Sequence, residues 1–92
     1  MLRITTEVDG AELVFKLEGS LSGPRVAEVE VCLRKRLGEE AGRAMRVDLC
    51  GVTFIDGAGK LLLADLHARG ATFRASSCAT RKIVAEVTGN PA

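Results

Sequence analysis

The Asp9-Gly10 pair separates two stretches in which residues of opposite polarity alternate. Alternation with a period of two places successive side chains on opposite faces of a β-strand. One face carries Leu2, Ile4, Thr6 and Val8 before the pair, and Leu13, Phe15 and Leu17 after it. An Asp-Gly pair between two such runs is the strongest short-range signal for a β-hairpin. The first 18 residues are therefore expected to form an antiparallel hairpin.

A helix is expected over residues 24–38, directly after a loop rich in Gly and Ser. Pro24 suits the first helical position, where a backbone N–H would have no partner within the helix. Apolar residues follow at the three- and four-residue spacings of one helix face: Val26, Val29 and Leu33. Glu30 and Arg34 lie one turn apart and are expected to form an ion pair.

Two further strands and two further helices complete the expected fold. The strands span residues 45–50 and 71–76, and the helices span residues 60–69 and 81–87. Residues 51–55 are expected to connect the first of these strands to Asp56, whose carboxylate can cap the helix that follows. The element order is then β-β-α-β-α-β-α.

This order predicts a mixed four-stranded sheet in an α/β fold. Strands joined through a helix run parallel with a right-handed crossover, whereas the hairpin is antiparallel. Every expected strand alternates in polarity, so the helices are expected to cover mainly one face of the sheet. A chain of 92 residues has room for one such domain, and residues 1–92 are interpreted as a single domain.

Charge and aromatic content argue against nucleic-acid binding. Lys and Arg number 13 against 12 Asp and Glu, which gives a net charge of +1, and the chain has three Phe but no Trp or Tyr. The chain therefore lacks both a positive field that would attract phosphates and the aromatic platforms on which bases stack. We expect no nucleic-acid partner.

The cysteines and the apolar runs indicate the cellular compartment in which the protein is expected to reside. Cys32, Cys50 and Cys78 form neither a disulfide framework nor a zinc-binding spacing, and are expected to be buried, unreactive thiols. The N-terminal residues lack the hydrophobic segment of a signal peptide. The longest apolar run, residues 61–64, is too short to insert into a membrane. These features predict a cytoplasmic protein with no metal or other cofactor.

Residues 47–63, with the sequence VDLCGVTFIDGAGKLLL, resemble the central motif of the STAS domain family, the bacterial anti-sigma-factor antagonists and their relatives. That motif is a strand ending in Asp-Leu-Ser, a few residues leading to an apolar residue and Ile-Asp, then Ser-Ser-Gly and a Leu-rich helix. Residues 19–22, Gly-Ser-Leu-Ser, are similar to the family's Gly-x-Leu-Asp after its second strand. The family's element order is similar too, so the resemblance covers nearly the whole chain.

The resemblance also implies a regulatory site at the start of the Leu-rich helix. In the family, a Ser there is often phosphorylated by a partner kinase, which switches partner binding off. Ala58 stands at that position and Gly57 at the Ser before it, so the phosphorylation switch is expected to be absent. Ser22 replaces the usual Asp, Cys50 replaces a frequent Ser, and Lys60 replaces a small or apolar residue.

The residues at this helix start each have two interpretations. Asp56 caps the helix, contacts a partner, or does both. Residues 57–59 are small either because the turn is tight or because a partner approaches the backbone closely. Lys60 opposes the helix dipole. It is either solvated or paired with Asp56, or else it meets an acidic group of a partner or a bound anion.

No general acid–base pair, activated nucleophile or metal-binding cluster can be assembled from the sequence, so we predict a non-enzymatic interaction domain of the STAS type. Its expected recognition surface comprises Leu21, Ser22, Asp56, Gly57, Ala58, Gly59 and Lys60. The resemblance implies a protein partner, either an anti-sigma kinase or another signalling protein. Two alternatives stay open. One is a small cytoplasmic subunit that scaffolds the ATPase of a lipid-transport ABC system, and the other is a domain that binds a nucleotide or another small ligand.

Overall fold

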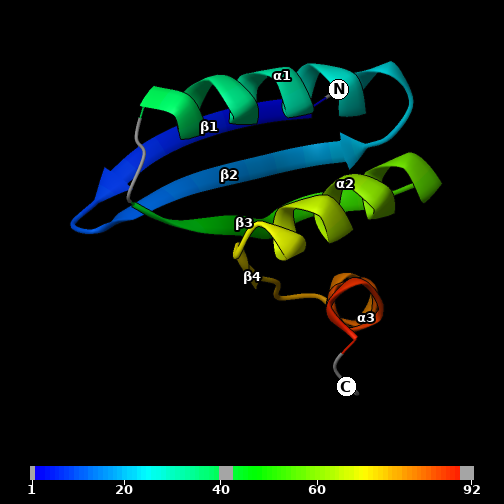
Figure 1. The fold of residues 1–92 in the computed structure, drawn as a ribbon. Helices are drawn as coiled ribbons and strands as arrows, with labels where there is room; N and C mark the ends of the chain where they lie inside the picture. The colour runs from blue at the N-terminus through cyan, green and yellow to red at the C-terminus, as the bar shows by residue number, and fades with distance from the viewer. Residues whose placement is uncertain (1, 40–42, 90–92) are drawn as a thin grey trace.

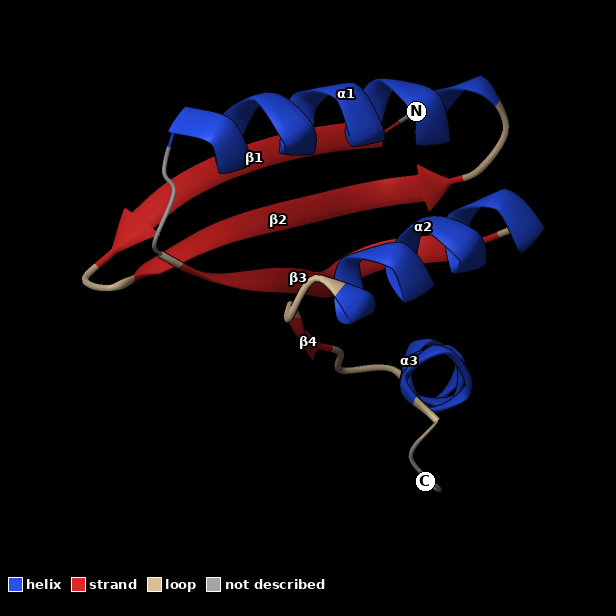
Figure 2. Cartoon of the chain, viewed as in Figure 1, coloured by secondary structure: helices blue, strands red, loops and turns tan. Residues whose placement is uncertain are grey.

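The computed structural model describes residues 2–39 and 43–89, and Met1 of the expected hairpin lies outside them. The elements are β1 (Leu2–Asp9), β2 (Glu12–Leu21), α1 (Pro24–Glu39), β3 (Ala44–Ile55), α2 (Gly57–Ala68), β4 (Thr72–Arg74) and α3 (Cys78–Thr88). Their order is the expected β-β-α-β-α-β-α. Figure 1 and Figure 2 show the strands side by side, with the helices packed against them.

The strands form one mixed sheet in the order β1-β2-β3-β4. β1 and β2 are antiparallel, with Leu2 opposite Gly19 at one end and Asp9 opposite Glu12 at the other. The pairs β2–β3 and β3–β4 are parallel, because each of these connections passes through a helix. The prediction of an α/β fold with a mixed four-stranded sheet is confirmed.

The hairpin closes through a two-residue turn at Gly10 and Ala11. Gly10 has a φ of 61°, and every residue with a positive φ in the described part of the chain is a glycine. A positive φ at the first central residue alone is characteristic of a type II′ turn, whose twist matches that of the paired strands. The Asp-Gly signal therefore located the turn, although Asp9 itself is the last residue of β1.

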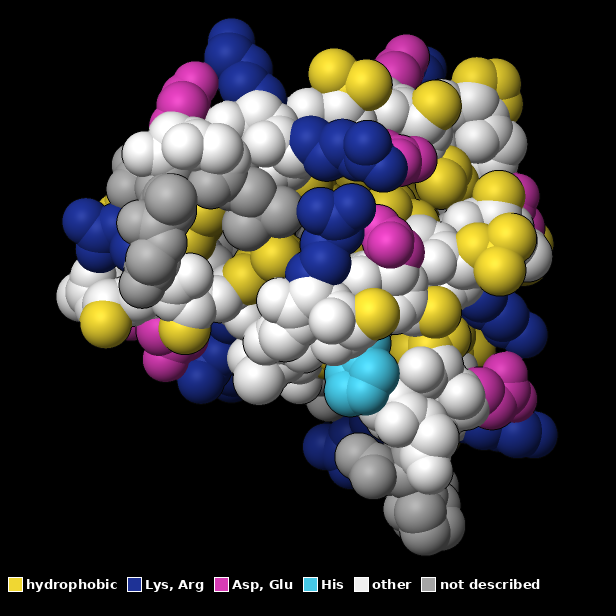
Figure 3. All heavy atoms as spheres, in the orientation of Figure 1, with side chains coloured by type: hydrophobic (Ala, Val, Ile, Leu, Met, Phe, Trp, Pro, Cys, Tyr) yellow, Lys and Arg dark blue, Asp and Glu magenta, His cyan; other side chains and the backbone are white. Residues whose placement is uncertain are grey.

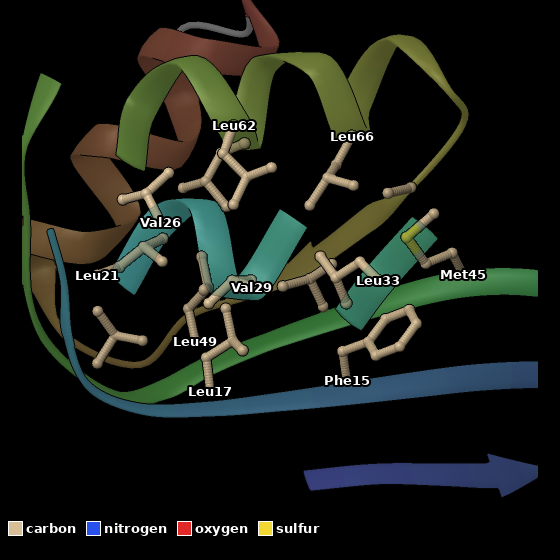
Figure 4. Close-up of a cluster of buried hydrophobic side chains, with 14 of the residues drawn as sticks. Phe15, Leu17, Leu21, Val26, Val29, Leu33, Met45, Leu49, Leu62 and Leu66 are labelled. Atoms are coloured by element: carbon tan, nitrogen blue, oxygen red, sulfur yellow. The ribbon is translucent and has the colours of Figure 1, made fainter. Parts of the chain in front are cut away.

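The hydrophobic core lies between one face of the sheet and the helices, as Figure 4 shows. Fully buried side chains come from β2, β3, α1 and α2, among them Phe15, Leu17, Val29, Val47, Leu49 and Leu63. Apolar residues of α3, namely Ile83, Val84 and Val87, pack against this cluster. Residues between the buried positions of β2 remain partly accessible, so the other face of the sheet is open, as the alternation predicts.

β3 is longer than expected, because residues 51–55, predicted as a connection, continue the strand. The two-residue step Lys16–Glu18 on β2 faces the three-residue step Asp48–Gly51 on β3, and a second register shift follows at Gly19–Ser20. Such β-bulges insert extra residues and interrupt the two-residue alternation by which strands are recognised. The prediction failed there because the alternation itself is broken.

Both α2 and α3 begin three residues earlier than expected, at Gly57 instead of residue 60 and at Cys78 instead of residue 81. The expected starts follow the apolar periodicity, which is absent from the first turn of each helix. In each helix the first turn is instead stabilised by an N-cap residue, Asp56 for α2 and Ser77 for α3. β4 is correspondingly shorter than expected and spans Thr72–Arg74.

The three cysteines are free thiols, but they are not all buried. Cys32 on α1 is half-buried, whereas Cys50 and Cys78 are exposed. Cys50 lies in the bulged part of β3 next to the buried Leu49, and Cys78 is the first residue of α3. The prediction of buried thiols is wrong for these two residues, because neither lies on the apolar face of its element.

Candidate functional site

Asp56 joins two segments that lie far apart in the sequence. Its Oδ1 accepts a hydrogen bond from the backbone N–H of Gly59 at 2.8 Å, which is the N-cap bond of α2. Its Oδ2 accepts a hydrogen bond from the backbone N–H of Gly23 at 2.9 Å, in the loop between β2 and α1. One carboxylate therefore fixes the start of α2 against the β2–α1 loop.

These hydrogen bonds also favour the ionised form of Asp56. The bond from Gly23, followed by that from Gly59, stabilises the carboxylate and holds the pKa of Asp56 below its ordinary value of 3.8. The group is therefore negative at neutral pH. A negative charge at this position interacts favourably with the dipole of α2.

The end of β2 and the first turn of α2 approach each other without space for a side chain between them. A Cβ added at the buried Gly59 would lie 2.6 Å from the carbonyl oxygen of Leu21. The backbone N–H of Asp56 donates to that same oxygen at 3.2 Å. The absence of a side chain at Gly59 is thus explained by packing within the chain, and not by an unusual backbone angle.

The predicted surface residues fall into two groups. Leu21 is fully buried and Gly59 is buried in α2, so neither residue offers an exposed side chain to a partner. Both residues position the site because their backbones pack together. The outward-facing residues are Gly57 and Ala58, which are exposed, and Ser22 and Asp56, which are half-exposed.

Lys60 pairs with α3 and not with Asp56. Its Nζ lies 3.3 Å from Oε2 of Glu86, and the two side chains are 44% and 50% exposed. Pairing with Asp56 was one of the alternatives for Lys60, and the structure shows the pair with Glu86 in its place. An ion pair this exposed contributes about 0–1 kcal/mol to stability. Its geometric effect is to hold Lys60 on the flank of α2 that faces α3.

A shallow groove of about 380 Å³ runs between α1 and α2. Its lining residues are Val26, Glu30, Arg34, Ala58, Leu61, Leu62 and Asp65. The expected ion pair between Glu30 and Arg34 is present at 2.6 Å and belongs to the α1 wall. Figure 3 shows hydrophobic side chains at the surface where the two helices meet. The groove reaches the start of α2, because Ala58 belongs to its lining.

Leu61 is 74% exposed beside Ala58 and was not among the residues predicted for the recognition surface. The signal for it lies in the run of three leucines at residues 61–63. Successive helical residues point about 100° apart, so three of them cannot all face one core. Leu62 and Leu63 are buried, which leaves Leu61 as the apolar residue directed outward.

The chemistry of this site comes from the backbone, one carboxylate and apolar contacts. Within residues 2–39 and 43–89, no group of three or more His, Cys, Asp or Glu side chains is placed to hold a metal ion. The sole histidine, His67, lies in the last turn of α2, away from Asp56. In this part of the chain, no helix has both the length and the apolar character needed to cross a membrane.

The fold is similar to those of solved anti-sigma-factor antagonists. A structure of an anti-sigma factor antagonist from Mycobacterium paratuberculosis matches 97% of this chain and 79% of its own, with a TM-score of 0.83 and 20% identity. The unphosphorylated form of the antagonist SpoIIAA matches 88% of this chain and 80% of its own, with a TM-score of 0.65 and 19% identity. The STAS domain of an antisigma-factor antagonist from Rhodobacter sphaeroides matches 80% and 84%, with a TM-score of 0.50 and 21% identity.

These likenesses establish that the chain has the fold of STAS-domain anti-sigma-factor antagonists. The resemblance seen in residues 47–63 is therefore confirmed at the level of the fold. No family model matches the sequence, and no curated protein matches it. The shared architecture is thus retained at sequence identities of about one residue in five.

Proposed function

We propose that this protein is a non-enzymatic regulatory domain that binds another protein through the start of α2 and the adjoining β2–α1 loop. The observation that carries the proposal is the pair of hydrogen bonds that Asp56 accepts, one from each segment. They hold Gly57 and Ala58 outward on a preformed surface. Binding to a preformed surface loses less conformational entropy than binding that must first order a loop.

The groove between α1 and α2 extends this surface. An exposed apolar side chain beside a polar rim is typical of a protein-binding site, because its burial against a partner removes apolar area from water. Leu61 supplies that side chain, and the Glu30–Arg34 pair lies along the α1 side. The proposed recognition surface therefore comprises Ser22, Asp56, Gly57, Ala58 and Leu61, with Lys60 on its flank.

The proposed partner is an anti-sigma kinase or a similar cytoplasmic signalling protein. The names of the three structures compared above support it, since those three are anti-sigma-factor antagonists. In this proposal, Ala58 occupies the position of the family's phosphorylated serine. Because alanine has no hydroxyl group, the domain stays in the form that binds its partner.

A matched pair of substitutions tests the location of the surface. Ala58 and Ala79 are both exposed, and each is the second residue of its helix. Glu at either position adds the same charge near the same kind of helix start. The partner used is the anti-sigma kinase encoded in the same genome, titrated calorimetrically against each variant.

We expect Ala58→Glu to weaken binding at least about tenfold, which corresponds to about 1.4 kcal/mol. Ala79→Glu is expected to bind like the unaltered protein. Equal loss in both variants, or no loss in either, would contradict the proposed surface. Circular dichroism of each variant establishes that its fold is retained.

Titrations with two other ligands address the alternatives from the sequence. One uses the ATPase of a lipid-transport ABC system from the same genome, and the other uses ATP or GTP. We expect no saturable binding in either case. Tight binding of an ATPase or of a nucleotide, without binding of the kinase, would replace the proposal with the corresponding alternative.

A further inference from the structure

β1 is the outer strand at one edge of the sheet, as Figure 1 shows. It spans eight residues, whereas β4 at the opposite edge spans three. An edge strand presents backbone N–H and C=O groups that can pair with another chain, and a long one offers more of them than a short one. β1 is therefore the edge at which strand pairing would be most extensive.

The hairpin determines which backbone groups of β1 are available. Asp9 and Glu12 flank the two-residue turn, so their backbone groups form hydrogen bonds with each other. Counted back from Asp9, every second residue of β1 likewise directs its backbone N–H and C=O groups toward β2. The intervening residues direct their backbone groups toward the free edge. These residues are Leu2, Ile4, Thr6 and Val8.

An antiparallel second copy can use all of these groups in one register. With Thr5 opposite Thr5 of the second copy, Leu2 faces Val8 and Ile4 faces Thr6, each contact occurring twice about a twofold axis. The same register places Arg3 opposite Glu7 twice. A shift of two residues in either direction instead places Thr5 opposite a charged residue.

The side chains of β1 are complementary in this register. Arg3 is exposed and has no ion pair with another residue of the described ranges. The side chain of Glu7 is 49% exposed and lies 3.3 Å from Lys16, so one of its sides remains open to a second cation. On the other face of the sheet, Val8 is 47% exposed and Leu2 is only partly buried. Pairing would join the opposite charges and cover Val8 with Leu2.

We propose that β1 binds β1 of a second copy of this chain, antiparallel and centred on Thr5, to form a twofold dimer with one continuous sheet. Arg3 and Glu7 favour this register, because it places both of them opposite a residue of the other charge, whereas a shift of two residues pairs Arg3 with Asp9 at most and leaves Glu7 without a cation opposite it. This inference is independent of the proposed function, since it involves neither α2 nor the β2–α1 loop.

Sedimentation equilibrium of the untagged chain tests the dimer, with two charge reversals as probes. Arg3→Glu places Glu against Glu across the twofold axis, and Glu7→Arg places Arg against Arg. Each variant is expected to weaken the dimer at least about tenfold. An equimolar mixture of the two restores both opposite-charge contacts, so the mixture is expected to form a heterodimer as stable as the original dimer.

Glu28→Arg, an exposed charge reversal on α1, serves as the control and is expected to leave the dimer intact. A wild-type chain that remains monomeric at millimolar concentration would overturn the proposal. It would also fail if the two β1 variants dimerised as well as the wild type, or if their mixture stayed monomeric. Circular dichroism of each variant excludes unfolding as the cause of a lost dimer.

Discussion

Helices α2 and α3 begin alike but are held differently. In α3, the Oγ of Ser77 accepts a hydrogen bond from the N–H of Thr80 at 3.1 Å, and its hydroxyl donates to Oγ1 of Thr80 at 2.8 Å. Both groups belong to Thr80, which lies three residues ahead in the sequence. In α2, Asp56 makes the same local bond to Gly59, and its second oxygen reaches Gly23, which lies 33 residues away.

The difference separates a local cap from a tertiary one. Ser77 stabilises only the first turn of its own helix, and any hydroxyl or carboxylate in that position would suffice. Asp56 uses both of its carboxylate oxygens, because one caps the first turn of α2 and the other holds the β2–α1 loop. The start of α2 is therefore tied to a distant part of the fold by the side chain of its N-cap residue, whereas the start of α3 is not. This difference supports the proposal that the start of α2 is a recognition surface.

Among the substitutions that test this difference, Gly59→Ala should have the largest effect on the free energy of unfolding. Its Cβ would lie 2.6 Å from the carbonyl oxygen of Leu21, and backbone atoms cannot move aside as a side chain can. We expect a loss of about 1–3 kcal/mol in the free energy of unfolding, measured by urea denaturation.

Gly57→Ala is the matched control, because no atom lies within 4 Å of the added Cβ. It lies in the same helical turn, and alanine favours the helix over glycine by about 1 kcal/mol. We therefore expect no loss, or a small gain, in the free energy of unfolding. A loss equal to that of Gly59→Ala would show that the contact with Leu21 is not the cause.

Asp56→Asn isolates the tertiary hydrogen bond. The amide oxygen of Asn still accepts from Gly59 as an N-cap, but its NH₂ group cannot accept from Gly23. We expect a lower urea midpoint and faster amide hydrogen exchange at Gly23, with the N–H of Gly59 remaining protected. Unchanged exchange at Gly23 would indicate that the loop is held by other contacts.

The same carboxylate predicts a dependence on pH. Its pKa is lower in the folded protein than the ordinary 3.8, because Gly23 and Gly59 donate hydrogen bonds to the ionised form. The stabilisation is fully present above the ordinary value and is lost as the pH falls through the lower, folded-state value. The stability difference between the unaltered protein and Asp56→Asn should thus shrink below about pH 4. A constant difference between pH 7 and pH 2 would contradict this assignment.

Ser77→Ala should have a smaller effect, because it removes only local hydrogen bonds. We expect a loss of about 1 kcal/mol in the free energy of unfolding, with no change in hydrogen exchange at the start of α2. Should Gly23 lose protection in this variant, the two helix starts would be coupled, and the contrast between a local and a tertiary cap would fail.

Much of this arrangement could be predicted from local patterns in the sequence. The alternation around Asp9-Gly10 gave the hairpin, the acidic residue before the small residues 57–59 gave the N-cap, and helical spacing gave the Glu30–Arg34 pair. Each of these features depends on residues that are close together in the sequence, where periodicity and capping preferences apply directly.

The missed features depend on residues that are distant in the sequence. The Gly23 bond to Asp56, the packing of Gly59 on Leu21 and the Lys60–Glu86 pair each join different elements. The groove and the bulges of β3 likewise arise only when helices pack or strands pair. The resemblance of residues 47–63 therefore indicated where the candidate site lies, but neither it nor the local patterns showed which of its residues face outward.

The central claim, that a partner kinase recognises the start of α2 and that Ala58 leaves no acceptor there, has one direct test. Ala58→Ser and Ala79→Ser each add a hydroxyl at the second position of a helix, and each is incubated with the cognate anti-sigma kinase and ATP. Mass spectrometry should find one phosphate on Ala58→Ser and none on Ala79→Ser or the unaltered chain. Phosphate on the unaltered chain at residues 56–60, or none on Ala58→Ser, would contradict the account.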